Sequence, residues 1–402
     1  MGVILDELVK QINPQDIQIV AGKKGLSNLV EWAHMVDNAE IASFLGGGEI
    51  AFTTGIGIRE DMSLLDLVKS VYEKNASGIF INVGPFIEEI GQEIIEFGNE
   101  HDFPIFEIPW RVHMADIMRM VCGTITRSEQ RAMELTAAFK NAIFSPKMEE
   151  LYIPVLMQKG YYTEWTYVVA VIDICDCTPS SDEKSICQYK NLSTERAAIL
   201  QKKIERRVLG LKYDAVIYPD QDKLLIIFSD TTEKEAAEML SDISSQIQSF
   251  LKNQEVVFSA VGKEVHQIRE VGQSYIIAHR MAEFMKLEGM ENEVRSYKQM
   301  GLMKMLLNLK SLDCLEEYYS ETIGPLEEYD ETSGGNLIET LTCYMKHNGS
   351  VQDAAEELYV HRNTVNYKLK KIESLLDVNL TDFQVRTNLM EGLLVRKMRK
   401  LK

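Results

Sequence analysis

Residues 349–372 read GSVQDAAEELYVHRNTVNYKLKKI, and this stretch decides the fold of the C-terminal region. Ser350 suits the N-cap of a helix, because its hydroxyl can accept a hydrogen bond from the first turn. Ala354, Ala355 and Leu358 give that helix a small apolar face, which a second helix can approach closely. The stretch therefore predicts a helix, a tight turn and a second helix.

The second helix has an apolar side and a polar side. Val365, Leu369, Ile372 and Leu376 are spaced four, three and four residues apart, which puts them on one stripe. The side chains expected to contact DNA are Arg362, Asn363, Thr364, Asn366, Tyr367, Lys370 and Lys371. Amides can pair with adenine edges and cations with phosphates, so this polar side suits the major groove. The layout is that of a helix-turn-helix with a recognition helix, although an ordinary helical hairpin with a solvated face would share it.

Charge favours the DNA-binding interpretation. Residues 346–402 contain 11 Lys and Arg against 7 Asp and Glu, whereas the whole chain of 402 residues has a net charge of −18. A small basic module on a strongly acidic body is typical of a nucleic-acid contact confined to that module.

Length and composition narrow the class of protein. A chain of this length suggests two to four domains, and its apolar content of 45% is enough for several cores. The sequence shows no membrane-spanning run and no basic secretory start, so we expect a cytoplasmic protein. Cys175, Cys177 and Cys187 lack the paired spacing of structural zinc sites. No nucleophile motif appears, so we expect no metal, no cofactor and no catalytic residues.

The first domain, residues 1–125, alternates short apolar runs with helical runs. The expected strands are 17–20, 30–36, 50–54, 79–83 and 104–108, and the expected helices are 63–74 and 86–100. This alternation predicts a mostly parallel α/β sheet. The run Gly46-Gly47-Gly48 is not a phosphate loop, because a strand follows where a helix is required.

Ligands of parallel α/β sheets bind beyond the carboxyl ends of the strands. The residues that this rule selects are His34, Asp37, Thr53, Thr54, Gly55, Asn82, Gly84, Glu107 and Arg111, with Trp32 and Trp110 nearby for stacking. Donors, acceptors and both charges would suit a polar small molecule of the purine or ureide kind. The alternative is that Thr and Gly merely end strands and that His34 pairs with a backbone carbonyl.

A long helix is expected over 113–144, and residues 126–160 are assigned to a helical linker that contains its second half. Its apolar positions follow approximate helical spacing, and the polar stretch 126–131 lies in its middle. Such a helix either pairs with a second copy in a dimer or serves as a rigid spacer.

The middle domain, residues 161–288, begins with an apolar strand at 167–173 and then a polar loop containing cysteines. The element order that follows resembles the ferredoxin-like core of a GGDEF domain. The resemblance would allow a nucleotide-cyclase-like signalling enzyme, and Asp173 and Asp176 could hold its cation. However, the hairpin turn Tyr218-Pro219-Asp220-Gln221-Asp222 has no glycine where the nucleotide must approach the backbone, so we expect a scaffold without enzymatic activity.

The C-terminal region, residues 296–402, is expected to be all helical, with the helix-turn-helix at 349–377 and a turn at Gly324-Pro325-Leu326. With all parts considered, the chain resembles PucR/CdaR-type bacterial transcriptional regulators over nearly its full length. The residues on which this resemblance rests are Trp32-Ala33-His34 with the run Gly47 to Gly55, which includes Glu49, and the helix-turn-helix signature from Gly349 to Ile372.

The resemblance implies an effector-responsive regulator of catabolic genes, with Glu49 added to the effector-site residues. Its implied partners are double-stranded operator DNA, a small-molecule effector and copies of the same chain in a dimer or tetramer, with no membrane. The N-terminal domain resembles the purine-catabolism-regulator type, which favours purine or related nitrogen compounds as the effector. Sugar diacids and amino acids remain open as alternatives.

Overall fold

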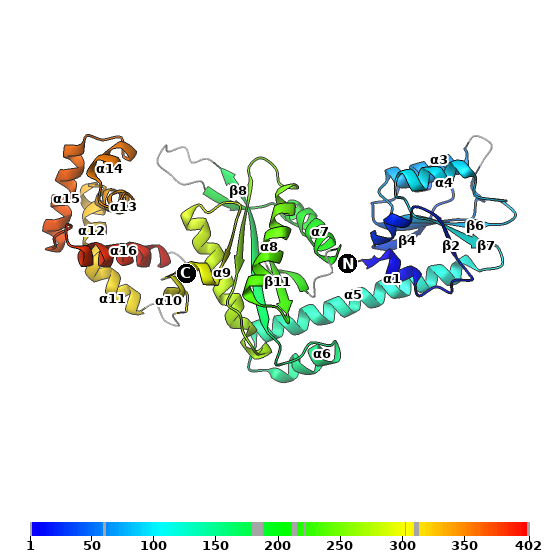
Figure 1. Cartoon of the computed structure of the whole chain (residues 1–402), viewed down its shortest axis with the longest axis horizontal. Helices are drawn as coiled ribbons and strands as arrows, with labels where there is room; N and C mark the ends of the chain where they lie inside the picture. The colour runs from blue at the N-terminus through cyan, green and yellow to red at the C-terminus, as the bar shows by residue number, and fades with distance from the viewer. Residues whose placement is uncertain are drawn as a thin grey trace.

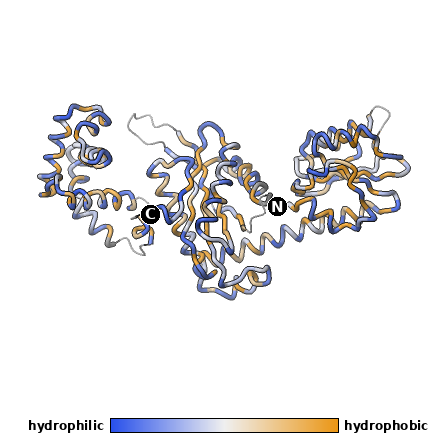
Figure 2. The backbone as a smooth tube through the Cα atoms, in the orientation of Figure 1, coloured by the Kyte–Doolittle hydropathy of each residue, from blue (hydrophilic) through white to orange (hydrophobic). Residues whose placement is uncertain are grey.

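The computed structural model describes residues 2–58, 62–178, 188–210, 215–220, 222–301, 303–308 and 313–399. Figure 1 shows an α/β domain, a central α+β domain and a helical C-terminal region, which follow one another along the long axis of the molecule. In Figure 2 the hydrophobic segments concentrate in the strands of the two large sheets. The expected fold class is confirmed.

The first domain contains a five-stranded sheet in the order β2-β7-β6-β5-β4. Its strands are β2 (Gln18–Ala21), β4 (Trp32–Met35), β5 (Glu49–Thr53), β6 (Gly78–Val83) and β7 (Ile105–Pro109). Strands β4 to β7 pair in parallel, and β2 pairs with β7 antiparallel. The sheet is therefore mostly parallel, as the alternation of strands and helices predicted.

Each face of this sheet is covered by helices. Helices α2 (Ala39–Ala42), α3 (Leu64–Glu73) and α4 (Gln92–Glu100) pack on one face, and α1 (Leu5–Val9) with the start of α5 packs on the other. On the α5 face, Phe80 stacks between Phe52 and Phe106, with ring centroids 4.9 and 4.5 Å apart. Side chains alternate along each strand, so Thr53 belongs to the α3 face and Asn82 to the α5 face.

The structure of this domain differs from the expectation in two places and adds a short 3-10 helix. Strands β1 (Val3–Ile4) and β3 (Leu29–Val30) form a separate two-stranded sheet that the sequence did not predict. The helix expected over 86–100 begins only at Gln92, as α4. After Gly22, which has a φ of 69°, the chain forms the 3-10 helix η1 (Lys23–Ser27).

Helix α5 (Met114–Phe144) runs unbroken for 31 residues and ends at Ser145. Its first half buries Ile117 and Val121 in the core of the first domain, and its second half buries Leu135 and Phe139 in the core of the central domain. The expected long helix is confirmed, and it is a structural part of both domains. The short helices η2 (Glu149–Leu151) and α6 (Ile153–Gln158) follow it.

The central domain has a sheet in the order β10-β11-β8-β12-β13, with β9 paired to β8. Its strands are β8 (Tyr167–Thr178), β9 (Gln188–Asn191), β10 (Ala215–Asp220), β11 (Lys223–Ser229), β12 (Glu255–Val261) and β13 (Glu293–Ser296). Helices α7 (Thr194–Gly210) and α8 (Glu233–Gln248) cover one face, while η3 (Ile268–Glu270), α9 (Val271–Glu288) and the end of α5 cover the other. This arrangement agrees with the expected α+β class.

Several boundaries in the central domain differ from those expected. Strand β8 continues to Thr178, because pairing with β9 and β12 carries the ladder through Cys175 and Cys177. Residues 179–187 of the expected polar loop, with Cys187, lie outside the described residues. Asp220 pairs with Lys223, so Pro219 and Asp220 belong to strand β10 rather than to the turn.

The C-terminal region consists of the 3-10 helix η4 and seven α-helices within the described residues. They are η4 (Tyr297–Met300), α10 (Met303–Leu307), α11 (Asp313–Thr322), α12 (Gly324–Ser333), α13 (Leu337–Lys346), α14 (Val351–Glu357), α15 (Arg362–Leu376) and α16 (Phe383–Met398). The turn expected at 324–326 was wrong, since Pro325 occupies the first turn of α12. Proline suits this position, because the first N–H groups of a helix have no partner within it.

Candidate nucleic-acid interface and candidate effector site

Helices α14 and α15 form the predicted helix-turn-helix. The Ser350 hydroxyl accepts a hydrogen bond from the backbone N–H of Asp353 at 3.3 Å and caps α14. His361 caps α15, because its Nδ1 accepts from the N–H of Asn363 at 3.2 Å. Between the helices Tyr359 has a φ of 52°, which turns the chain from one axis to the next.

The apolar stripe of α15 packs as its spacing predicted. Val365, Leu369 and Ile372 are buried, and so are the small residues Ala354 and Ala355 of α14. The buried stripe fixes the rotation of α15 about its own axis. The opposite side of the helix must therefore face solvent.

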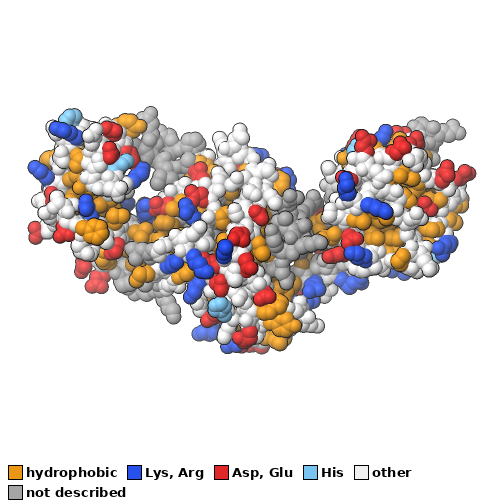
Figure 3. All heavy atoms as spheres, viewed as in Figure 1, with side chains coloured by type: hydrophobic (Ala, Val, Ile, Leu, Met, Phe, Trp, Pro, Cys, Tyr) orange, Lys and Arg blue, Asp and Glu red, His pale blue; other side chains and the backbone are white. Residues whose placement is uncertain are grey.

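Most of the side chains expected to contact DNA are exposed. Arg362, Asn363, Thr364, Asn366 and Lys370 are exposed, and Tyr367 retains 70% of its accessible surface. Figure 3 shows Lys and Arg side chains along the edge of the region where Figure 1 places α15. Amides, hydroxyls and cations thus occur together on one convex surface.

Lys371 is placed differently. Its ammonium lies 5.0 Å from the centre of the Tyr329 ring on α12, and the residue is half-buried. It therefore faces its own domain.

Tyr359 is the reverse case, since it was not selected from the sequence and is 96% exposed in the turn. The signal that marks it is an aromatic residue where a turn between helices favours glycine.

The candidate effector residues fall into separate groups. In the first group Asp37 accepts hydrogen bonds from the Thr53 hydroxyl at 3.1 Å and from the Thr54 N–H and hydroxyl at 3.0 and 3.2 Å. The N–H of Gly55 donates to the Thr53 hydroxyl at 3.2 Å. These groups lie at the carboxyl ends of β4 and β5, and they pair with one another.

A second group surrounds the carboxyl ends of β6 and β7. The Asn82 amide donates to the carbonyls of Ile108 and Pro109 at 3.1 and 3.4 Å. Gly84 lies against Trp110 so closely that a Cβ there would be 2.7 Å from the Cβ of Trp110. Arg111 donates to the carbonyl of Gln15 at 2.9 Å, away from the Asp37 group.

The remaining candidates lie elsewhere on the sheet. Trp32 and Glu49 are register partners at the amino ends of β4 and β5, so they lie at the opposite edge from Asp37. His34 pairs with Ala51 within the sheet, and Glu107 pairs with Ile81. The structure does not gather all of the selected residues into one pocket.

A cavity of about 1100 Å³ lies at the amino ends of the first sheet's strands, between this domain, helix α7 and Phe250 just after α8. Its polar and aromatic lining includes Lys24, Asn28, Tyr72, Asn75, Ser77, His101, Lys203 and Phe250. None of the effector residues selected from the sequence lines it. The sequence could not indicate this cavity, because it forms only when two domains meet.

In the central domain Asp173 is buried and surrounded by cations. Its Oδ2 lies 2.6 Å from the Lys286 ammonium and 3.4 Å from the Lys223 ammonium, and its Oδ1 accepts from the Cys175 thiol at 3.2 Å. Burial opposes charge on the two lysines, but the nearby carboxylates outweigh it and raise the pKa of both. Two ammonium groups at one carboxylate leave no electrostatic need for a divalent cation there.

The environment of Cys175 disfavours the thiolate form of its side chain. Burial, and then the charge of Asp173, raises the pKa of its thiol to about 12. A thiol of this kind stays protonated at neutral pH and behaves as a small core residue.

Comparisons with known proteins agree with this three-part architecture. Residues 7–125 match the purine catabolism regulatory protein-like family, residues 159–284 match the GGDEF-like domain, and residues 337–395 match the PucR C-terminal helix-turn-helix domain. The fold and the exposed face of α15 define a multidomain helix-turn-helix protein. Domain by domain, and in this order along the chain, the protein is thus similar to PucR-type regulators.

Relatives from Bacillus subtilis share parts of the chain. The proline-responsive transcriptional activator PutR is 24% identical over 46% of this chain and 46% of its own length. The purine catabolism regulatory protein is 28% identical over 33% of this chain and 26% of its own length. The DNA-binding transcriptional activator AdeR is 25% identical over 50% of this chain and 49% of its own length. The chain spans less than half the length of each of these relatives.

Within the described residues, no helix is both long enough and apolar enough to span a membrane.

Proposed function

We propose that the chain is an effector-responsive, DNA-binding transcriptional regulator of a catabolic operon that acts in the cytoplasm. The observation that carries this proposal is the exposed face of α15, whose orientation is fixed by the buried residues Val365, Leu369 and Ile372. In this proposal the exposed Asn363 and Tyr367 read base edges, and Arg362 and Lys370 hold phosphates.

The experiment measures binding of the full-length chain to promoter DNA from its chromosomal neighbourhood and to a scrambled duplex. We expect Asn363→Ala and Tyr367→Ala to weaken promoter binding more than scrambled binding, by about 1–3 kcal/mol for each lost base contact. Tyr162→Ala, which removes an exposed tyrosine from another domain, serves as the control. Equal losses on both duplexes would contradict base reading by α15.

The effector is proposed to be a purine breakdown product or a related nitrogen compound. The support is the similarity of residues 7–125 to a purine-regulator family. Relatives include a proline-responsive activator, so amino acids are the second class to test. A thermal-shift screen with purines, ureides, sugar diacids and proline distinguishes these classes.

Variants in the two candidate binding regions test where the effector binds. Asp37→Asn disturbs the carboxyl edge of the sheet, and Lys24→Ala disturbs the cavity at the amino edge. We expect Asp37→Asn to reduce the thermal shift and Lys24→Ala to leave it unchanged. The reverse result would move the binding site to the cavity between the domains.

The working assembly is proposed to be a dimer or tetramer that binds a two-fold operator, as two symmetric recognition helices require. Light scattering of the free protein and of its DNA complex measures the number of chains.

The central domain is proposed to act as a scaffold, since Asp173 is paired with Lys286 and Lys223. Incubation with GTP and Mg²⁺ should yield no cyclic nucleotide, and any such product would overturn the scaffold role.

A further inference from the structure

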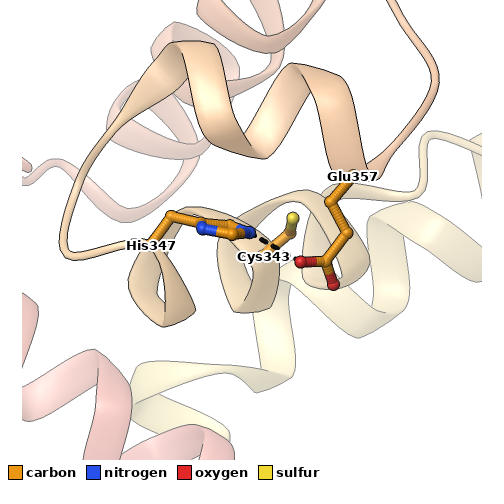
Figure 4. A group of neighbouring side chains, drawn as sticks. All are labelled: Cys343, His347 and Glu357. Carbon is orange, nitrogen blue, oxygen red and sulfur yellow. Dashed lines mark hydrogen bonds and ion pairs between the residues drawn. The ribbon is translucent and has the colours of Figure 1, made fainter.

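Three side chains that commonly bind metals converge beside the helix-turn-helix. Cys343 lies on α13, His347 caps the end of that helix four residues later, and Glu357 is the last residue of α14. The Cys343 Sγ, one ring nitrogen of His347 and one carboxylate oxygen of Glu357 all lie within 4.8 Å of one another. Figure 4 shows the three side chains pointing toward one another from the two helices.

We propose that Cys343, His347 and Glu357 form a binding site for a divalent cation of the zinc class. Sulfur, imidazole nitrogen and carboxylate oxygen are together the ligand types that Zn²⁺ takes in proteins. Three protein ligands leave the fourth position of a tetrahedron to solvent. The half-buried His347 and the exposed Glu357 make the site accessible from outside.

Metal binding requires only small movements of these side chains. The Nε2 of His347 lies 2.6 Å from the Oε2 of Glu357, and these two atoms must separate slightly to admit a metal between them. The thiol of Cys343 loses its proton to solvent as the metal–sulfur bond forms. Lys346 can continue to donate to the Oε1 of Glu357, at 2.9 Å, and so orient the carboxylate.

The competing explanation is an ion-pair network without a metal. Lys346 already neutralises Glu357, His347 hydrogen-bonds to it, and the Cys343 thiol donates to the carbonyl of Ala354 at 3.6 Å within the core. This network accounts for Glu357 and His347. It does not require a thiol beside them, and the sulfur is the atom that distinguishes the two explanations experimentally.

A bound metal would join α13 to the end of α14, directly before the turn that leads to α15. It would therefore hold the recognition helix more firmly on its own domain, because opening α14 away from α13 would cost a metal–ligand bond. Hydrogen exchange of residues 351–357 should become slower in the presence of Zn²⁺.

The direct test is a Co²⁺ titration of the chelator-treated full-length protein, followed by absorption and by competition with Zn²⁺. We expect one Co²⁺ per chain, with a sulfur-to-cobalt charge-transfer band. Cys343→Ala should remove that band, and His347→Gln should keep it while weakening Co²⁺ binding at least about tenfold. Circular dichroism of both variants checks that they remain folded.

Matched controls use the same residue types away from the site. Cys122→Ala alters a half-buried cysteine on α5, and His101→Ala alters an exposed histidine of the first domain. Both should bind Co²⁺ as the unmodified chain does. The proposal is overturned if the unmodified chain binds no more Co²⁺ than the Cys343→Ala/His347→Gln double variant. No DNA is present, so this outcome is separate from the fate of the proposed regulatory function.

Discussion

The ammonium of Lys371 lies 5.0 Å from the centre of the Tyr329 ring, so this cation of α15 packs on α12. Its neighbour Lys370 is exposed and has no such contact among the described residues. Adjacent lysines on one helix therefore have different environments. They offer a paired test of which cation reaches a phosphate.

Lys370→Ala should reduce the salt dependence of DNA binding, because one phosphate contact contributes about 0.9 to the slope of log K against log salt. Lys371→Ala should leave that slope nearly unchanged and lower the free energy of unfolding by about 0.5–1 kcal/mol through the lost cation–ring contact. Salt titrations of DNA binding and urea unfolding of both variants check the prediction. A large fall of the slope in Lys371→Ala would contradict it.

Tyr359→Asn should raise the free energy of unfolding. The φ of 52° at Tyr359 places a bulky residue in the left-handed region, at a cost of about 1–2 kcal/mol. Asparagine tolerates this conformation better, and the exposed tyrosine ring loses little packing. Urea unfolding measures the change, and Tyr162→Asn, at an exposed tyrosine in another domain, is the control. An unchanged or lower stability would show that the turn carries no removable strain.

Glu255→Gln should destabilise the central domain at neutral pH. Glu255 receives two hydrogen bonds from Arg196, at 2.7 and 2.6 Å, and this pairing lowers the pKa of its carboxyl below the ordinary 4.5. Removing one partner of a buried charged hydrogen bond costs about 1.5–3 kcal/mol.

The loss caused by Glu255→Gln should depend on pH. Because the folded-state pKa is lowered, the pairing stabilises the protein above pH 4.5 and loses its effect as the pH falls further and Glu255 is protonated. Urea unfolding at several pH values should show the two proteins converging in acid. Glu238→Gln, at an exposed pair with Lys234, should show no such trend. A difference that persists unchanged in acid would exclude the charged pairing as its cause.

Asp173→Asn should lower the free energy of unfolding by about 3–5 kcal/mol, because it leaves two buried ammonium groups without their shared carboxylate. Lys223 would keep Glu283, at 2.9 Å, whereas Lys286 would lose its contact at 2.6 Å and keep only Glu283, at 3.8 Å. Thermal unfolding against the exposed Asp242→Asn control measures the effect. A loss as small as that of the control would show that water reaches the cluster.

The sequence predicted those features that depend on neighbours along the chain. The buried stripe of Val365, Leu369 and Ile372 follows from helical spacing, and so does the long helix α5. The expected turn at 324–326 failed because Pro325 can either break a helix or begin one, and local sequence does not decide between them.

Features that depend on contacts between distant segments could not be predicted in this way. Strands β1 and β3 have two residues each, too few to show any periodicity. The approach of Glu357 to Cys343 depends on how α14 crosses α13. Trp32 and Asp37 are close in sequence, yet strand β4 runs between them. Trp32 lies at its amino end and Asp37 lies just beyond its carboxyl end.

Helix α5 is roughly 46 Å long at 1.5 Å per residue, and its two halves are anchored in different cores. A rotation of the first domain cannot be absorbed by a flexible linker, because α5 continues without a break and packs against the central sheet. A tilt of a few degrees at one end would become a displacement of ångströms at the other. A small rearrangement in the first domain would therefore reach the core of the central domain as a larger displacement.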